Sequence, residues 1–519
     1  MKEVRRDLSE EELQKRREAL LARKRAVRRK KRRNAIIFKS VILAALIAVL
    51  AIAIWFISGG AKKISSNVTG RTSVIAENAQ NQDGETGDAA NGGSSIAARA
   101  GEAQRTSLIS EARFKASQYD YEGAMESLLR IPDAESDSEI ISIMADIETM
   151  KSNLVAVSPY DITSLYFQSL IVDPSRGFSL IGDEIWDTNT VNYCEWMNTT
   201  YEFGQILTQM YNRGYVLVGI NDIIERETDE NGYVHVYPKE IYLPQGKMPF
   251  ILSVDDLNYY HSYNGRGMAS RIVIGDNNKP KCEYYDASGN ALVGSYDIIP
   301  ILDDFIEIHP DFSYKGAKGT IALTGYNGIL GYRTDYTYRD RIDIDPDQEL
   351  YLAGHPDYSF ENEVAKATAV AQCLKDDGWT FACHTWGRIP VGQADISWIA
   401  SDTEKWITYV ESIVGDTDIA MFAYGEDIAA WDEVYSQTEK FQYYKAMGFN
   451  VFAYSDSSTQ IIRFGDEFSD GYFRMSRRAL DGFRLWEAVY GGYDGVSDLV
   501  DAATVIDPAR PTDAYLYSF

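Results

Sequence analysis

The chain has 519 residues and a formal net charge of −26, from 77 Asp or Glu against 51 Lys or Arg. This length allows two to four domains, and so acidic a chain argues against a nucleic-acid-binding protein, because phosphate backbones bind basic surfaces. The four cysteines have neither metal-site spacing nor the density of a disulfide scaffold, so we expect small buried residues.

The charge is distributed unevenly along the chain. Residues 1–34 hold 15 Lys or Arg against 6 Asp or Glu, whereas residues 35–58 are apolar apart from Lys39. The apolar segment is long enough to cross a bilayer, and the positive-inside rule places the basic tail in the cytoplasm. We therefore expect a single-pass anchor in the cytoplasmic membrane, with the rest of the chain outside. A cleaved signal peptide is the alternative interpretation.

Two segments separate this anchor from the main domain. Residues 59–102 are mostly small and polar, which predicts a flexible stalk. Residues 103–156 carry apolar side chains at helical spacing with two breaks, which predicts a short helical hairpin that resembles a tetratricopeptide-like unit. One such unit cannot complete a solenoid. It is therefore either a spacer packed on the next domain or a small docking module.

The remaining residues, 157–519, alternate short apolar runs with helical segments. One helix follows a capping box formed by Thr199 and Glu202 and ends at Gly214. Strands are expected at 249–256, 319–326, 379–383, 418–425, 449–455 and 472–475. A polar insertion is expected up to residue 294, and an irregular loop at 331–359. Strands that alternate with helices predict an α/β fold with a parallel sheet.

Two of these strands end in side chains that can bind a metal. The run at 249–254 ends in Asp255 and Asp256, and the run at 379–383 ends in His384. Because α/β barrels carry their chemistry at the carboxyl ends of their strands, the three residues form a candidate site. For the adjacent acids alone, the alternative is a helix N-cap or a turn.

Together the two motifs resemble the NodB-type polysaccharide deacetylases, carbohydrate esterase family 4. In that family one strand ends in Thr-Phe-Asp-Asp-Gly and a later one in His-Ser/Thr-x-x-His. Here the motifs read Ser-Val-Asp-Asp-Leu at 253–257 and His-Thr-Trp-Gly-Arg at 384–388. The resemblance extends over about residues 241–485. It implies that 157–519 form an extracytoplasmic, distorted (β/α)7-type barrel.

The resemblance also implies roles for individual residues. Asp255 would be the general base acting on a metal-bound water, while Asp256 and His384 would hold zinc or another divalent metal. Three further residues would line the site: Thr385, Arg388 and Tyr424. The implied substrate is an acetylated sugar of the bacterial cell wall or of an extracellular polysaccharide. Metal and carboxylate together can make water nucleophilic near neutral pH.

The sequence departs from the family pattern at the second metal-binding histidine. Arg388 stands at that position, and a guanidinium has no lone pair to offer a metal. Two protein ligands remain where catalytic zinc normally has three, so the chain either holds no metal or recruits another ligand. His261 and His355 are the histidines that could reach the pocket from loops.

Two other family features are eroded. The motif Arg-x-Pro-Tyr-Gly aligns with 421–425, which keeps Tyr424 but lacks the arginine that pairs with the base. No histidine follows His384, so the usual general acid is missing. An ion pair between Arg388 and Asp256 could replace the charge of the metal. Two functions follow: a metal-assisted deacetylase, or an inactive deacetylase-fold protein that binds glycan or scaffolds envelope assembly.

Overall fold

The computed structural model describes residues 92–179, 188–430, 433–457, 460–465, 471–492 and 495–512. The expected basic tail, residues 1–34, and the expected membrane span, residues 35–58, lie outside this part of the chain. Among the helices that are described, none is both long and apolar enough to cross a membrane.

Seven parallel strands close into a barrel, which confirms the (β/α)7-type barrel of the prediction. In order around the barrel they are β2 (Thr163–Phe167), β7 (Met248–Asp255), β11 (Thr320–Leu323), β12 (Thr380–Cys383), β13 (Ile419–Met421), β14 (Val451–Ser455) and β16 (Phe473–Ala479). β16 pairs with β2 and closes the ring. Two short strands flank it: β3 (Tyr215–Leu217) runs parallel to the start of β7, and β15 (Ile462–Phe464) antiparallel to the start of β16.

The helix predicted before the first acid motif is α7 (Thr200–Asn212). Its capping box is present, since Thr199 Oγ1 accepts the Glu202 N–H at 3.1 Å and Glu202 accepts the Thr199 N–H at 2.8 Å. Gly214 follows the helix with a φ of +88°, a conformation that costs glycine little. Both predicted ends of this helix are therefore confirmed.

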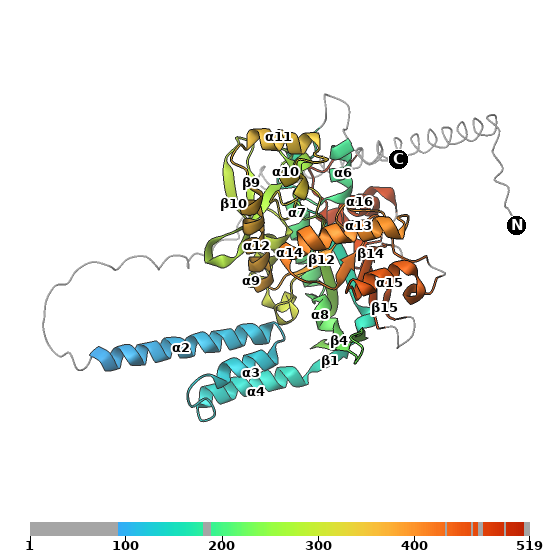
Figure 1. Ribbon diagram of the computed structural model, residues 1–519. Coiled ribbons are helices and arrows are strands. Elements are labelled where there is room, and N and C mark those ends of the chain that lie inside the picture. Colours follow the sequence, from blue (N-terminus) through green and yellow to red (C-terminus); the bar gives the residue numbers. More distant parts are fainter. Residues whose placement is uncertain are drawn as a thin grey trace, which may run out of the picture. The chain divides into compact units, whose positions relative to one another are not determined.

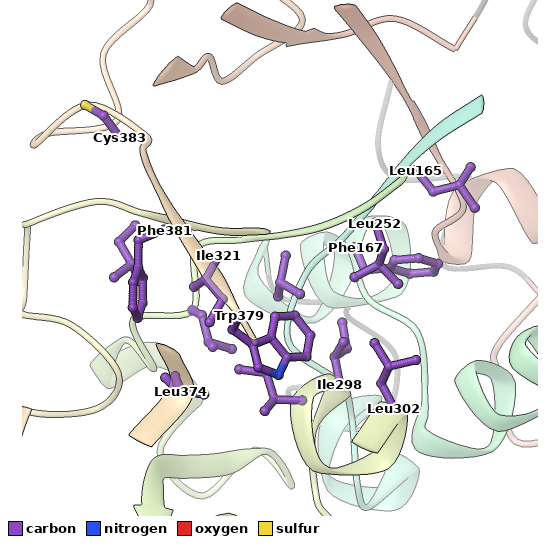
Figure 2. Close-up of a cluster of buried hydrophobic side chains, with 14 of the residues drawn as sticks. Leu165, Phe167, Leu252, Ile298, Leu302, Ile321, Leu374, Trp379, Phe381 and Cys383 are labelled. Atoms are coloured by element: carbon purple, nitrogen blue, oxygen red, sulfur yellow. The ribbon is translucent and has the colours of Figure 1, made fainter. Parts of the chain in front are cut away.

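Apolar faces of further helices pack on the outside of the barrel. The longer ones are α9 (Ile298–Ile308), α12 (Phe360–Asp376), α13 (Ile396–Trp406) and α15 (Glu439–Ala446), followed by the short α16 (Gly482–Trp486). Figure 2 shows part of this core, where buried side chains of β2, β7, β11 and β12 meet Ile298 and Leu302 of α9 and Leu374 of α12. The four cysteines are buried and free, as expected.

Several predicted irregular segments contain regular structure. The insertion after the acid motif forms an antiparallel sheet of β8 (Ala269–Ile274), β9 (Pro280–Tyr285) and β10 (Ala291–Gly294). The expected loop at 331–359 contains α10 (Tyr336–Asp340) and α11 (Pro346–Gly354). Both helices begin at an Asp N-cap, a local signal that the loop interpretation overlooked. A hairpin of β4 (Ile224–Thr228) and β5 (Val234–Pro238) precedes β6 (Ile241–Pro244).

The segment before the barrel consists of α2 (Gly92–Ser117), α3 (Tyr121–Leu129) and α4 (Ser138–Ser152), which lie side by side (Figure 1). The first of them, α2, begins inside the expected stalk of residues 59–102, because residues 97–105 are rich in the good helix formers Ala, Arg, Glu and Gln. The spacer expected to end at residue 156 ends in a strand, β1 (Leu154–Val157), which pairs with β6.

These three helices share one hydrophobic cluster with the barrel interior. Ala124 and Leu128 of α3 belong to the same cluster as Ile251 and Ala322, which point into the barrel. Tyr119 donates to the Asp311 carbonyl at 2.8 Å, and residue 311 lies just before β11. The helices therefore cover the amino-terminal end of the strands, which leaves the carboxyl end for the site.

The buried carboxyl of Asp297, the N-cap of α9, makes the free energy of unfolding depend on pH. It is fully buried and accepts the N–H groups of Leu170 and Ile298 and the Tyr259 hydroxyl, and burial raises its pKa to about 6. Between pH 3.8 and about 6 the folded state holds a proton that the unfolded state has lost, so this carboxyl lowers stability as pH rises. At about 1.4 kcal/mol per pKa unit, the effect is roughly 2–3 kcal/mol.

We expect Asp297→Asn to gain stability relative to the native chain by that amount between pH 4 and pH 7. Urea unfolding at a series of pH values measures the difference. A constant difference across this range would contradict the assignment.

Candidate functional site

Asp255 lies inside the carboxyl end of the barrel and is bound by an arginine. Strand alternation places Ser253 and Asp255 on the inner face of β7. Arg477 of β16 donates from Nη1 to Asp255 Oδ1 at 2.5 Å and to Ser253 Oγ at 2.9 Å. The Arg477 side chain is fully buried, and its guanidinium lies 5.1 Å from the centre of the Tyr166 ring. This is a desolvated, charge-assisted pair.

Asp256, the second acid, forms an ion pair with Arg388. The Arg388 Nε lies 2.9 Å from Asp256 Oδ2, yet its N–H is not directed at a hydrogen-bond acceptor, so the contact is ionic. Tyr260 donates its hydroxyl to Asp256 Oδ1 at 3.0 Å. Burial, and then the charge of Asp256, raise the pKa of Tyr260, which keeps this hydroxyl protonated. The charge of Asp256 likewise raises the pKa of Arg388.

The backbone at the strand ends takes an unusual conformation. Four of the non-glycine residues with positive φ are residues that the sequence assigned to the site: Asp256 at 58°, Thr385 at 61°, Arg388 at 51° and Tyr424 at 62°. Asp tolerates this region, but a β-branched Thr there is an outlier. Backbone strain of this kind is common at functional sites.

His384 follows β12 and has one ring nitrogen fixed. Its Nδ1 lies 2.7 Å from the Met421 carbonyl oxygen, so Nδ1 carries the proton and donates it. The residue is 1% exposed and lines the cavity described below. Nε2 is therefore the nitrogen left to accept a hydrogen bond or to bind a metal, an arrangement typical of metal-binding imidazoles.

Asp255, Asp256, His384, Arg388 and Tyr424 line one cavity of about 530 Å³. The sequence thus predicted five of the residues that line it, from the ends of three strands between residues 255 and 424. The cavity is also rich in aromatic and amide side chains that the sequence did not assign: Tyr166, Gln168, Asn189, Asn192, Tyr193, Trp196, Tyr260 and Tyr263. Asn189 to Trp196 come from α6 (Thr188–Trp196).

Three residues that the sequence placed in or near the site do not line this cavity. Thr385 is buried and accepts the Ile389 N–H at 2.9 Å, so it holds the turn between His384 and Arg388 and does not line the cavity. His261 is buried with Nε2 2.6 Å from the Tyr338 hydroxyl, and burial lowers its pKa to about 4. His355 lines a different cavity. Neither histidine supplies the missing ligand.

The donor set does not fit a catalytic metal. Within the described residues, no group of three His, Cys, Asp or Glu side chains is placed to hold one. The cavity offers His384 Nε2 and the carboxylates, but Asp256 is neutralised by Arg388 and Asp255 by Arg477. A divalent cation would have to displace or face a guanidinium within 3 Å of its principal carboxylate ligand. The imidazole, the carboxylates and the guanidinium groups of this cavity can instead donate and accept hydrogen bonds.

The sequence reasoning missed Arg477. Residue 421 is Met where the resemblance implies the arginine that pairs with the base, and β16 supplies an arginine instead. The predicted strand ended at residue 475, and β16 continues to Ala479. Three arginines in residues 474–478 were the available signal, since charged residues on a barrel strand are unusual unless they are paired.

Comparisons with known proteins find matches among solved structures only. No protein-family profile matches the sequence, and no curated protein matches it. Three solved chains match. One is the Streptococcus pyogenes deacetylase PplD in complex with acetate, with 11% identity, 68% of this chain and 100% of that chain covered, and a TM-score of 0.32. Another, BA0330 of Bacillus anthracis, is described as a polysaccharide deacetylase, with 10% identity, 68% and 70% covered, and a TM-score of 0.31. Scores this low carry no argument about activity.

Proposed function

We propose that this chain is a glycan-binding protein built on a deacetylase-like barrel, with a cavity that holds sugar without metal-assisted hydrolysis. The ion pair of Arg388 with Asp256, at 2.9 Å, carries the proposal. It puts a permanent positive charge where the resemblance implies a metal. Breaking such a half-buried pair to admit a cation would leave an uncompensated guanidinium.

The walls of the cavity support sugar as the ligand. Tyr424 and Trp196 line it and remain 59% and 45% exposed. The Arg388 guanidinium lies 4.7 Å from the centre of the Tyr424 ring, but both rings keep exposed surface on which a sugar ring can stack. Asn189, Asn192 and Gln168 offer paired donors and acceptors for hydroxyl groups. An aromatic cavity with a few convergent polar groups is typical of small-ligand sites.

The expected membrane anchor fits this function and is part of the proposal. Residues 35–58 would hold the barrel on the outer face of the cytoplasmic membrane, where cell-wall or extracellular polysaccharide is the available glycan. The protein would then bind or organise that polymer.

A metal-assisted deacetylase is the second candidate, and one observation favours it. Nδ1 of His384 is committed to the Met421 carbonyl, which leaves Nε2 for the cavity, as in metal-binding histidines. Asp255 also keeps an arginine partner, Arg477, although from a different strand. For this candidate, Arg388 would have to move away from Asp256.

The test measures binding and hydrolysis on the same purified full-length chain. We expect an N-acetylglucosamine hexamer to bind by titration calorimetry, with no acetate released and no stoichiometric zinc. Tyr424→Ala and Trp196→Ala should each weaken binding about tenfold, because one stacking contact is worth up to about 1.5 kcal/mol.

Trp398→Ala is the matched control. Trp398 is 49% exposed on α13 and does not line the cavity, so its loss should leave affinity unchanged. Acetate release with one bound zinc would overturn the proposal in favour of the second candidate. An equal loss of affinity in the Tyr424, Trp196 and Trp398 variants would show that the cavity is not the place where the glycan binds.

A further inference from the structure

A second cavity of about 560 Å³ adjoins the first. Tyr263 lines both, so the two cavities share a wall. The second cavity lies between β8, the turn before it, and the segment that leads into α12. Four cationic and two acidic side chains line it: Arg176, Arg271, Arg333, Lys366, Asp357 and Glu363. An excess of cationic side chains is unexpected in a chain with a net charge of −26.

Most of these cations have a carboxylate partner. Arg176 pairs with Asp173 at 2.8 Å, and Arg271 with Glu283 at 2.8 Å. Lys366 lies 3.2 Å from Glu363 but keeps a 57% exposed side chain at the rim. These three pairs leave little charge uncompensated.

Arg333 is the exception. The residue is only 5% exposed, and no carboxylate in the described part of the chain lies within ion-pair distance of its guanidinium. Its Nη1 donates to two carbonyl oxygens, of Tyr259 at 3.0 Å and Asn327 at 3.4 Å. Glu363 accepts the backbone N–H of Arg333 at 3.0 Å instead of pairing with its side chain. Burial lowers the pKa of Arg333, and the neighbouring Tyr338, Tyr351 and Glu363 offset this only in part.

The guanidinium of Arg333 is thus held by two carbonyls and lies 5.6 Å from the centre of the Tyr351 ring, but it has no carboxylate counterion in the described part of the chain. A buried charge without a counterion is costly to fold and therefore points to a missing anion. We infer that this cavity binds an anionic group, carboxylate or phosphate, carried by the glycan whose neighbouring sugar occupies the first cavity. Arg333 would provide the buried contact and Lys366 the contact at the rim. The link to a glycan rests on the proposed function, whereas the anion site rests on Arg333 alone. The polymer would accordingly be acidic.

Calorimetry with four probes tests the inference on the full-length chain: glucuronate, inorganic phosphate, a uronate hexamer and the neutral N-acetylglucosamine hexamer. We expect the uronate hexamer or a phosphate-bearing ligand to bind more tightly than the neutral hexamer. Lys366→Glu should weaken anion binding about tenfold, since hydrogen bonds to charged groups are worth about 1.5–3 kcal/mol. Arg333→Gln should weaken it by at least as much.

Lys375→Glu is the matched control, because Lys375 is exposed on the same helix, α12, and does not line the cavity. It makes the same change of charge and should leave affinity within about twofold. Because Lys366 is exposed, Lys366→Glu stays informative if Arg333→Gln fails to fold.

The single anions identify the source of the charge. Binding of glucuronate alone assigns a sugar carboxylate, and binding of phosphate alone assigns a phosphorylated polymer. If neither single anion binds and Lys366→Glu leaves the affinity of the uronate hexamer unchanged, the inference is overturned. The proposed function fails separately, when Tyr424→Ala leaves the affinity of the neutral hexamer unchanged.

Discussion

Arg388→His is expected to give the cavity a zinc site. The substitution removes the cation beside Asp256 and adds a third donor to Asp256 and His384, the number that catalytic zinc normally takes from protein. Zinc affinity should rise at least about 100-fold, because even the residues behind metal ligands change it by about 10–100-fold. Metal content after dialysis and calorimetric titration with zinc measure the gain.

Arg388→Met is the control for this experiment. It removes the same guanidinium and adds no nitrogen donor, so it should release Asp256 without creating a tight site. Tight zinc binding by the native chain would contradict the proposed function. No gain in the His variant, with the fold intact, would mean that residue 388 cannot turn toward the metal position. Acetate release need not accompany zinc binding, since no histidine after His384 supplies the general acid.

Arg510→Met is expected to lower the free energy of unfolding by about 3–5 kcal/mol. Arg510 donates to Glu202 through Nε at 2.6 Å and Nη2 at 2.5 Å, and to the carbonyls of Cys194 and Met197 at 2.7 Å. Both charged side chains are at most 1% exposed. Without the arginine, Glu202 stays buried and unpaired at the start of α7. Denaturant unfolding of the full-length chain, followed by tryptophan fluorescence, measures the loss.

Two variants separate the burial of charge from general damage. Arg226→Met breaks a partly exposed pair with Asp418 and should cost no more than about 1 kcal/mol. Glu202→Gln combined with Arg510→Met should recover part of the loss, because no charge is then left buried. A cost below 1 kcal/mol for Arg510→Met would show that water reaches Glu202.

The sequence was sufficient to predict which strand ends meet around the cavity. Asp255, His384 and Tyr424 follow apolar runs, and a closed parallel barrel brings all such ends to one rim. The pairing of Arg388 with Asp256 was one of the arrangements that the sequence suggested, because a guanidinium at that position cannot bind a metal, and the structure contains this pair.

Other parts of the site could not be predicted. Arg477 contacts Asp255 across 222 residues, and only the closure of β16 against β2 brings them together. Arg333 stands in a segment without periodicity, where nothing local indicates burial. The helix α6 contributes four cavity residues from a sequence with no marked apolar face. These contacts depend on tertiary packing, which neither propensity nor periodicity reports.

The apolar cluster shared by α2 to α4 and the barrel interior has a mechanical consequence. A pull applied ahead of Gly92 would not act on an independent module, because Ala124 and Leu128 belong to the same apolar cluster as Ile251 and Ala322, and β1 is hydrogen-bonded along β6. Peeling the helices away would expose apolar side chains of this cluster to water. We therefore expect the three helices and the barrel to unfold together under a mechanical load.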